Sequence, residues 1–179
     1  TLSDIGKLPN DLDGIIWVSG FTGNPVIEIS NIDKARYNIE INFSNVVLSI
    51  TSLLKKINYS KETFICVICS VAGIRGRKKR LYYAASKAGL INFMSGLRQQ
   101  MYNKSKVITV IPGYISTESF EKLNEKSPNF LISSPQEASK IILNAIKNNK
   151  EVVYIKSIWR IIMLIIKLIP EKIYKKFEF

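Results

Sequence analysis

Residues 70–87 have the sequence SVAGIRGRKKRLYYAASK and follow directly on the apolar run at residues 63–69, TFICVIC. The apolar run predicts a buried strand, and the alanine-rich segment after residue 81 predicts a helix. Tyr83 and Lys87 are four residues apart in that helix, so their side chains share one face. The sequence therefore predicts a serine, Ser70, at the carboxyl end of a strand and a Tyr–Lys pair at the start of a helix.

This combination of side chains suits proton transfer. A free tyrosine has a pKa near about 10, and a neighbouring cation lowers that pKa by favouring the phenolate. General acid–base catalysis is most effective when the pKa lies near the working pH. We therefore expect Tyr83 to exchange a proton with a substrate, Lys87 to lower its pKa, and Ser70 to hydrogen-bond the substrate oxygen. The alternative is a surface helix pair with a serine in a turn.

The segments Tyr83-Ala-Ala-Ser-Lys87-Ala-Gly-Leu90 and Pro112-Gly113-x-x-x-Thr117, together with Ser70, resemble the motifs of the short-chain dehydrogenase/reductase family. The resemblance implies a Rossmann-like fold and hydride transfer between NAD or NADP and a carbonyl or alcohol substrate. It also implies that Ser70 and Tyr83 are at the carbonyl oxygen and that Tyr83 and Lys87 contact the cofactor, Lys87 at the ribose. Pro112, Gly113 and Thr117 are expected at the nicotinamide.

Two further residues are assigned from the same resemblance. Gly20 matches the glycine of an N-N-A-G-like turn that lies along the cofactor, although Trp17 and Val18 replace the usual asparagines. Asn42 matches the fourth catalytic member, an asparagine that supports a proton-relay water near the lysine. A solvent-facing asparagine remains the alternative for Asn42, because other asparagines lie close to it in the same predicted helix.

Composition narrows the classes of function. The chain has no histidine, which excludes a Ser-His-Asp triad and a histidine-based metal site, and no metal site is expected. Cys66 and Cys69 are within an apolar run, so we interpret them as buried strand residues rather than a redox or zinc pair. The net charge of the chain is +12, but no nucleic-acid-binding motif accompanies it. The charge therefore favours an anionic cofactor or a negatively charged membrane surface as partner. Free thiols and the lack of a signal peptide predict a cytoplasmic protein.

The chain organisation predicts an α/β, doubly wound parallel sheet. Buried strands are expected at 14–20, 63–69, 106–111 and 151–155, and helices at 33–57, 83–102 and 135–149. Residues 114–132 are expected to cover the substrate, with Phe120 and Phe130 as apolar contacts. Residues 1–155 form the C-terminal portion of one Rossmann-like domain, and residues 156–179 form its tail. The family resemblance implies a homo-oligomer.

One family motif is absent. None of the nine glycines forms the G-x-x-x-G-x-G turn that brings the backbone to the pyrophosphate at a helix N-terminus. We expect the first two strand–helix units, of roughly 30 residues each, to be missing. We therefore interpret the chain as a fragment that is inactive alone.

The segment 158–177 is apolar and basic, but it is too short and too charged to span a bilayer. Two interpretations stay open: an amphipathic segment at the inner face of the membrane, or a helix over the substrate pocket or a partner subunit. The basic loop 75–80 either meets an anionic substrate or lipid phosphate or is solvated. Together these segments resemble reductases of lipid-linked keto-sugars in cell-envelope synthesis, of the decaprenylphosphoryl-2-keto-pentose type. The competing function is a non-catalytic membrane-surface or subunit-interaction module.

Overall fold

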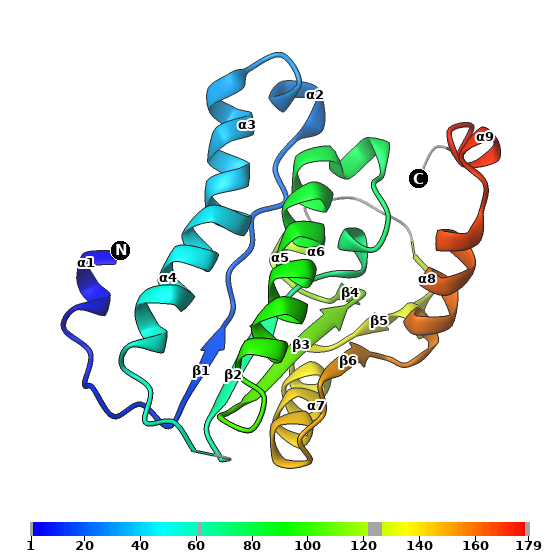
Figure 1. Cartoon of the computed structure of the whole chain (residues 1–179). Coiled ribbons are helices and arrows are strands. Elements are labelled where there is room, and N and C mark those ends of the chain that lie inside the picture. The colour runs from blue at the N-terminus through cyan, green and yellow to red at the C-terminus, as the bar shows by residue number, and fades with distance from the viewer. Residues whose placement is uncertain (1, 61, 122–126, 178–179) are drawn as a thin grey trace.

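A parallel sheet forms the centre of the computed structural model, which describes residues 2–60, 62–121 and 127–177. The strands are β1 (Gly14–Trp17), β2 (Phe64–Ile68), β3 (Lys106–Pro112) and β6 (Val152–Ile155), in the order β1-β2-β3-β6 (Figure 1). All three pairings are parallel. The predicted α/β fold with a parallel sheet is confirmed. Strand β1 ends three residues earlier than predicted, and the bounds of the other three strands differ from the predicted ones by at most one residue.

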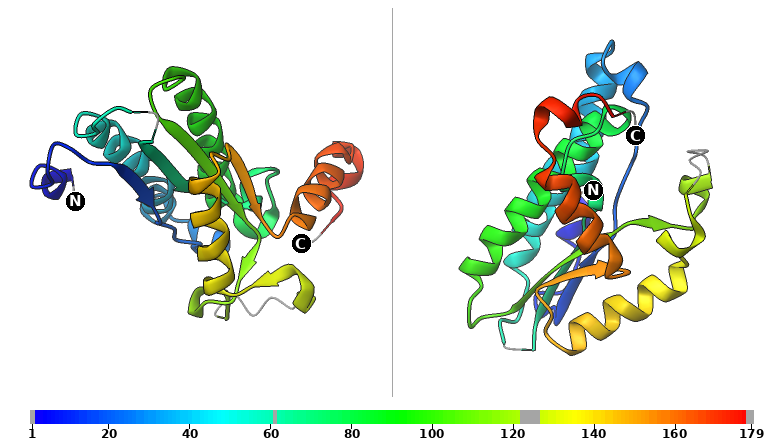
Figure 2. Two further views of the ribbon diagram at one scale, coloured as in Figure 1. Left: turned by 90° about the horizontal axis from the view of Figure 1, so that it is seen from below. Right: turned by 90° about the vertical axis from the view of Figure 1, so that its right-hand side faces the viewer.

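Apolar residues cover both faces of the sheet. Ile65 and Val67 of β2 pack into a core with Val46 and Ile50, whereas Cys66, between them, faces a second core. The first core is covered by α4 (Asn45–Leu54) and α5 (Leu81–Gln100), and the second by α7 (Pro135–Lys147) (Figure 2). A strand buried on both faces reads as a continuous apolar run, which explains why FICVI does not alternate.

The remaining elements are short or peripheral. They are α1 (Leu2–Ile5), α2 (Pro25–Glu28), α3 (Ile32–Ile39), a π-helix (Glu40–Ser44), 3-10 turns at Val71–Gly73, Lys78–Arg80 and Asn129–Leu131, β4 (Tyr114–Ile115), α6 (Glu118–Glu121), β5 (Ile132–Ser133), α8 (Ile158–Leu168) and α9 (Glu171–Tyr174). The predicted cap of α7 is confirmed, because the Ser134 side chain accepts from the Glu137 backbone N–H at 3.0 Å and Pro135 is the first helical residue.

The helix expected at 33–57 is not one regular helix. Helices α3 and α4 are joined through the π-helix Glu40–Ser44, which contains Asn42. A π turn adds a residue to the helical repeat, so the residues on either side change their facing. The periodicity of apolar residues continues across this insertion, which is why the sequence alone predicted an uninterrupted helix.

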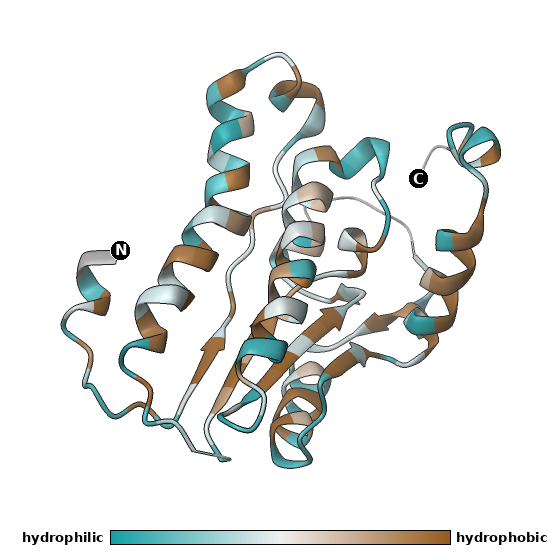
Figure 3. Cartoon of the chain, in the orientation of Figure 1, coloured by the Kyte–Doolittle hydropathy of each residue, from teal (hydrophilic) through white to brown (hydrophobic). Residues whose placement is uncertain are grey.

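The tail begins where β6 ends. Helix α8 packs Trp159 and Met163 into the first core, while Ile161, Leu164, Ile165 and Leu168 stay exposed. In Figure 3 the apolar colouring of α8 therefore continues onto its solvent side. One face of α8 thus packs on the domain and the other faces outward, and both interpretations of the tail stay predictions. The domain boundary at residue 155 stays a prediction. Of the loop 114–132, residues 122–126 lie outside the described residues.

Candidate functional site

Ser70 and Tyr83 meet where β2 ends and α5 begins. Ser70 follows the last residues of β2 and caps the 3-10 turn Val71–Gly73, with its Oγ accepting the Ala72 N–H at 3.1 Å. Tyr83 is in the first turn of α5, and its hydroxyl hydrogen-bonds the Ser70 side chain. Because the Oγ of Ser70 already accepts from the backbone, its own hydrogen is available for donation. The structure thus brings the predicted pair together.

The surroundings of Tyr83 act on its pKa in both directions. Burial raises the pKa of Tyr83 above its ordinary value, while the Ser70 hydrogen bond and the charges of Arg80 and Arg77 lower it. Lys87 Nζ lies 5.8 Å from the centroid of the Tyr83 ring, over its aromatic face. The role of Lys87 in the acidity of Tyr83 stays a prediction.

Lys87 is almost fully buried, with 2% of its surface exposed. Its Nζ donates to the carbonyl oxygens of Ser19 at 3.0 Å and Ile68 at 3.1 Å, which belong to the ends of β1 and β2. Burial lowers the pKa of Lys87, and the nearby Cys69 acts in the opposite direction. Since an ammonium carries three donors and two are used by these carbonyls, one remains for a ligand.

Asn42 is fully buried, so the solvent-facing alternative is wrong. Its Nδ2 donates to the Phe21 carbonyl at 2.7 Å, and its Oδ1 accepts the Phe21 N–H at 2.9 Å. A Cβ built on Gly20 would lie 3.8 Å from both Asn42 Oδ1 and Lys87 Nζ. Gly20, Asn42 and Lys87 therefore meet at the end of β1. The role of Asn42 in a proton relay stays a prediction.

The three residues predicted at the nicotinamide lie near the end of β3. Pro112 is the last residue of β3, and Gly113 follows it directly. A Cβ on Gly113 would overlap the indole of Trp159, so the residue must be glycine to accept the packing of α8. Thr117 is exposed and its Oγ1 accepts the Phe120 N–H at 3.4 Å, at the start of α6. Their assignment to the cofactor stays a prediction.

The basic loop 75–80 is divided between two tasks. Arg75 binds the tail: its guanidinium donates to the carbonyls of Ile166 at 2.7 Å and of Ile169, and to Glu171 at 2.8 Å. It also lies 3.8 Å from the centroid of the Tyr174 ring. Arg75 is therefore not solvated, and contact of the loop with an anionic ligand stays a prediction. The charges of Arg77 and Arg80 act on Tyr83 instead.

Three functionally placed residues were missed by the sequence analysis. Glu28 and Asn38 are buried beside Asn42, and Trp159 is buried against Gly113. Asn38 precedes Asn42 by four residues, so a shared helical face was a usable signal. Glu28 and Trp159 contact the site only through tertiary packing, for which the sequence carries no local signal. Phe130 is 65% exposed, whereas Phe120 packs on Tyr114 with ring centroids 5.1 Å apart.

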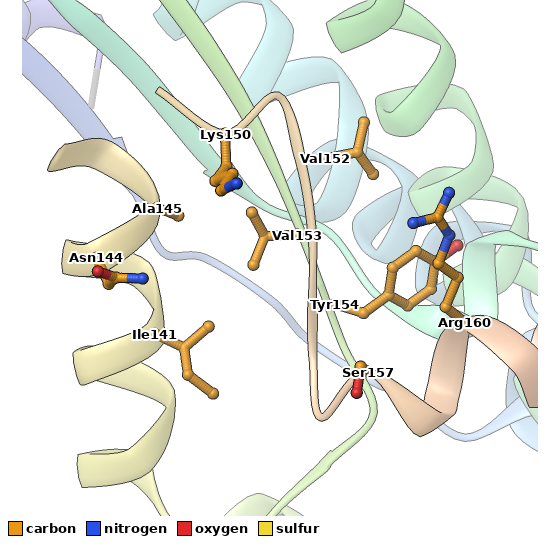
Figure 4. Close-up of a pocket in the computed structure, with 9 residues that line it drawn as sticks. All are labelled: Ile141, Asn144, Ala145, Lys150, Val152, Val153, Tyr154, Ser157 and Arg160. Atoms are coloured by element: carbon orange, nitrogen blue, oxygen red, sulfur yellow. The ribbon is translucent and has the colours of Figure 1, made fainter. Parts of the chain in front are cut away.

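A pocket lies between α7 and the edge strand β6 (Figure 4). Its walls include Ile141, Val153 and Tyr154, and Arg160 approaches Tyr154 at its rim. It shares no residue with the Ser70–Tyr83–Lys87 cluster.

Among the described residues, no helix is long and apolar enough to cross a membrane.

Comparison with known proteins identifies the family. The profile of the short chain dehydrogenase family matches residues 1–128, and the chain therefore belongs to that family. Among curated relatives, the 3-oxoacyl-acyl-carrier-protein reductase FabG of Buchnera aphidicola is 33% identical over 126 residues, covering 69% of this chain and 51% of the relative. The bovine 3-oxoacyl-acyl-carrier-protein reductase is 25% identical over 127 residues, covering 70% and 54%. The chain spans about half the length of the curated relatives it matches.

Solved structures share the fold. A short chain dehydrogenase from Burkholderia cenocepacia in complex with NADP superposes with a TM-score of 0.72 at 20% identity, covering 91% of this chain and 69% of that one. A 3-oxoacyl-acyl-carrier-protein reductase from Brucella melitensis in complex with NAD gives a TM-score of 0.71 at 18% identity, covering 90% and 72%. These similarities confirm the Rossmann-like architecture.

Proposed function

We propose that the complete protein is an NAD- or NADP-dependent oxidoreductase that interconverts a carbonyl group and an alcohol. The observation that carries this proposal is the contact of the Ser70 and Tyr83 hydroxyls above the buried ammonium of Lys87. Family membership supports the reaction class, and the NADP and NAD bound in the related structures support the cofactor class.

The residues divide the proton chemistry between them. Because burial raises the pKa of Tyr83, the phenol keeps its proton at neutral pH and can act as the acid. Ser70 donates its hydroxyl hydrogen to the substrate oxygen and holds that oxygen beside Tyr83. Tyr83 then transfers its proton to the oxygen as the carbonyl carbon is reduced. Nicotinamide, when bound, supplies the hydride for this step.

The residues at the end of β1 fit the nicotinamide end of such a cofactor. Lys87 keeps one donor beyond those given to Ser19 and Ile68, which suits a ribose hydroxyl. Gly20 has no side chain there, and a Cβ at this position would have only ordinary contacts with Asn42 and Lys87. Gly113 offers its backbone, because Trp159 covers its α-carbon.

Two substrate classes are compared in the test. The names of the curated relatives favour a 3-oxoacyl thioester, and the basic, apolar tail favours a lipid-linked keto-sugar. The experiment follows NADH and NADPH oxidation by the complete gene product with acetoacetyl-coenzyme A and with a polyprenyl-phosphate keto-sugar. We expect turnover with the thioester. Turnover with the keto-sugar alone would assign the substrate to the lipid-linked keto-sugars. Turnover with neither substrate, together with no binding of NADH or NADPH, would contradict the proposal.

We also propose that the outer face of α8 contacts an anionic membrane surface. Its exposed aliphatic residues form one stripe: Ile158, Ile161, Leu164, Ile165 and Leu168. Arg160 and Lys167 are two turns apart, so they share the edge of this stripe, and Lys172, Lys175 and Lys176 follow. Apolar side chains flanked by cations are typical of helices at a bilayer interface, where each Lys or Arg contributes about 1 kcal/mol next to anionic lipid.

The membrane contact is tested on this chain by co-sedimentation with vesicles. We expect binding to phosphatidylcholine vesicles that contain phosphatidylglycerol, weaker binding in high salt, and loss of binding in the Ile161→Gln/Ile165→Gln variant. Leu143→Gln, at an exposed leucine of α7, is the matched control. Equal binding of both variants would contradict the proposal. The oligomeric state of the same protein preparations is measured by sedimentation equilibrium, which tests the predicted homo-oligomer. Dimerisation through the stripe would contradict the membrane proposal and would assign the stripe to a second copy of the chain.

A further inference from the structure

A chain of buried polar side chains leads from α2 to the end of β1. Glu28 is 4% exposed, and Asn38 and Asn42 are fully buried. Asn38 Nδ2 donates to Glu28 Oε1 at 2.7 Å, and Asn42 Nδ2 donates to Asn38 Oδ1 at 2.8 Å. Asn42 Oδ1 in turn accepts the Phe21 N–H at 2.9 Å. The amides of Asn38 and Asn42 thus connect the Glu28 carboxylate to the backbone of the turn at the site.

The two ends of this series of hydrogen bonds, the Glu28 carboxylate and the Phe21 N–H, each require the amide orientations given above for Asn38 and Asn42. A carboxylate can only accept, so the Nδ2 of Asn38 must face Glu28 and its Oδ1 must face Asn42. A backbone N–H can only donate, so the Oδ1 of Asn42 must face the Phe21 N–H, while its Nδ2 donates to Asn38 and to the Phe21 carbonyl. An amide reversed at either position would place two donors or two acceptors together in a buried environment.

The fold keeps this chain close-packed. Gly23 has a φ of 67°, a left-handed conformation that favours glycine. A Cβ on Gly23 would overlap both the Glu28 carboxylate and the Asn38 amide. The turn after β1 therefore passes directly over the Glu28–Asn38 hydrogen bond, and both the glycine and the short helix α2 at the top of Figure 1 serve this contact.

This series of hydrogen-bonded side chains ends at the residues that carry the proposed chemistry. Asn42 binds both the N–H and the carbonyl of Phe21, as an adjacent strand would. Two residues earlier, the Ser19 carbonyl accepts from Lys87. Gly20, between them, lies against both Asn42 and Lys87. The position of Ser19–Phe21 relative to the ammonium of Lys87 is thus fixed from two sides.

We propose that Glu28 and Asn38 are positioning residues of this site. They hold the amide of Asn42, and through it the turn 19–21, in register with Lys87. The inference rests on the proposed function for its effect on turnover. Its structural part, the restraint of Phe21, is independent of any reaction.

The test compares four variants with the wild-type protein. Glu28→Gln keeps an acceptor for Asn38 and is the conservative control. Glu28→Leu and Asn38→Leu each leave a buried polar partner unpaired, whereas the Glu28→Leu/Asn38→Leu double variant removes both partners and regains stability. Hydrogen exchange of the Phe21 amide is measured relative to that of the Ile65 amide in β2, and kcat and KM are measured on the complete gene product.

We expect the double variant to unfold near the wild-type urea midpoint while its Phe21 amide exchanges at least about tenfold faster relative to Ile65. Its kcat/KM for the cofactor falls at least about tenfold with the KM for the carbonyl substrate unchanged, and Glu28→Gln stays within about threefold. Wild-type exchange at Phe21 in the double variant would overturn the proposal. If that variant does not fold, Asn38→Ser, which is too short to span Glu28 and Asn42, gives the same comparison. Faster exchange in a protein without NAD(P)-dependent turnover would refute the proposed function alone.

Discussion

Arg75 provides the sharpest test of how the tail is attached. Its guanidinium bonds carbonyls at the C-terminal end of α8, forms an ion pair with Glu171 and lies over the Tyr174 ring. A hydrogen bond from a charged group contributes about 1.5–3 kcal/mol, and a partly exposed cation–π contact about 0.5–1 kcal/mol. Because Glu171 is exposed, its ion pair adds little. We expect Arg75→Ala to weaken attachment of α8 by about 3 kcal/mol, which is about a hundredfold in the opening equilibrium.

The assay is hydrogen exchange followed by mass spectrometry of the peptide covering α8. We expect exchange in this peptide to rise about a hundredfold in Arg75→Ala, with little change in peptides from β2 and β3. Lys79→Ala, at an exposed residue of the same loop, is the matched control and should exchange like the wild type. Unchanged exchange of α8 in Arg75→Ala would refute the argument, because packing of Trp159 and Met163 would then hold the helix without the guanidinium.

Two further outcomes follow from burial and backbone conformation. Gly23→Ala should lower the free energy of unfolding by at least about 2 kcal/mol in urea titrations, whereas Gly76→Ala, with open space around it, should stay within about 0.5 kcal/mol. Burial raises the pKa of the Cys66 and Cys69 thiols from 9.0 to about 12, so the unfolded chain loses these protons first. Stability should then fall between about pH 9 and 12, by up to about 1.4 kcal/mol per pH unit for each thiol, with Lys87 opposing the fall below its ordinary pKa of 10.5. A flat urea midpoint across this range would show that the thiols are not buried.

The parts of the fold that the sequence predicted depend on local patterns. The apolar run at residues 64–68 is long enough only for a strand buried on two faces, and its end places Ser70. Four-residue spacing on a helix puts Tyr83 and Lys87 on one side. Ser134 and Pro135 mark the start of α7 by their own hydrogen-bonding and backbone preferences. Such features require only neighbouring residues.

The parts that were not predicted depend on contacts between distant residues. The partners of Arg75 in the tail are more than 90 positions away, so nothing near Arg75 indicated them. Trp159 is at the edge of an apolar stretch, and only the close approach of Gly113 explains why it is buried. The π turn at Asn42 coincides with the buried hydrogen bonds of Asn42, and the apolar repeat of the helix does not indicate it.

We propose Tyr83 as the proton donor of a site completed by Ser70 and Lys87. The most direct measurement is NADH- and NADPH-dependent turnover of a carbonyl substrate by the complete gene product and by its Tyr83→Phe variant, with thermal unfolding of both. Since general acid catalysis contributes about 10²–10⁴-fold, we predict that the variant loses at least about a hundredfold in kcat and unfolds at nearly the wild-type temperature. Wild-type turnover in a folded Tyr83→Phe protein would contradict the claim.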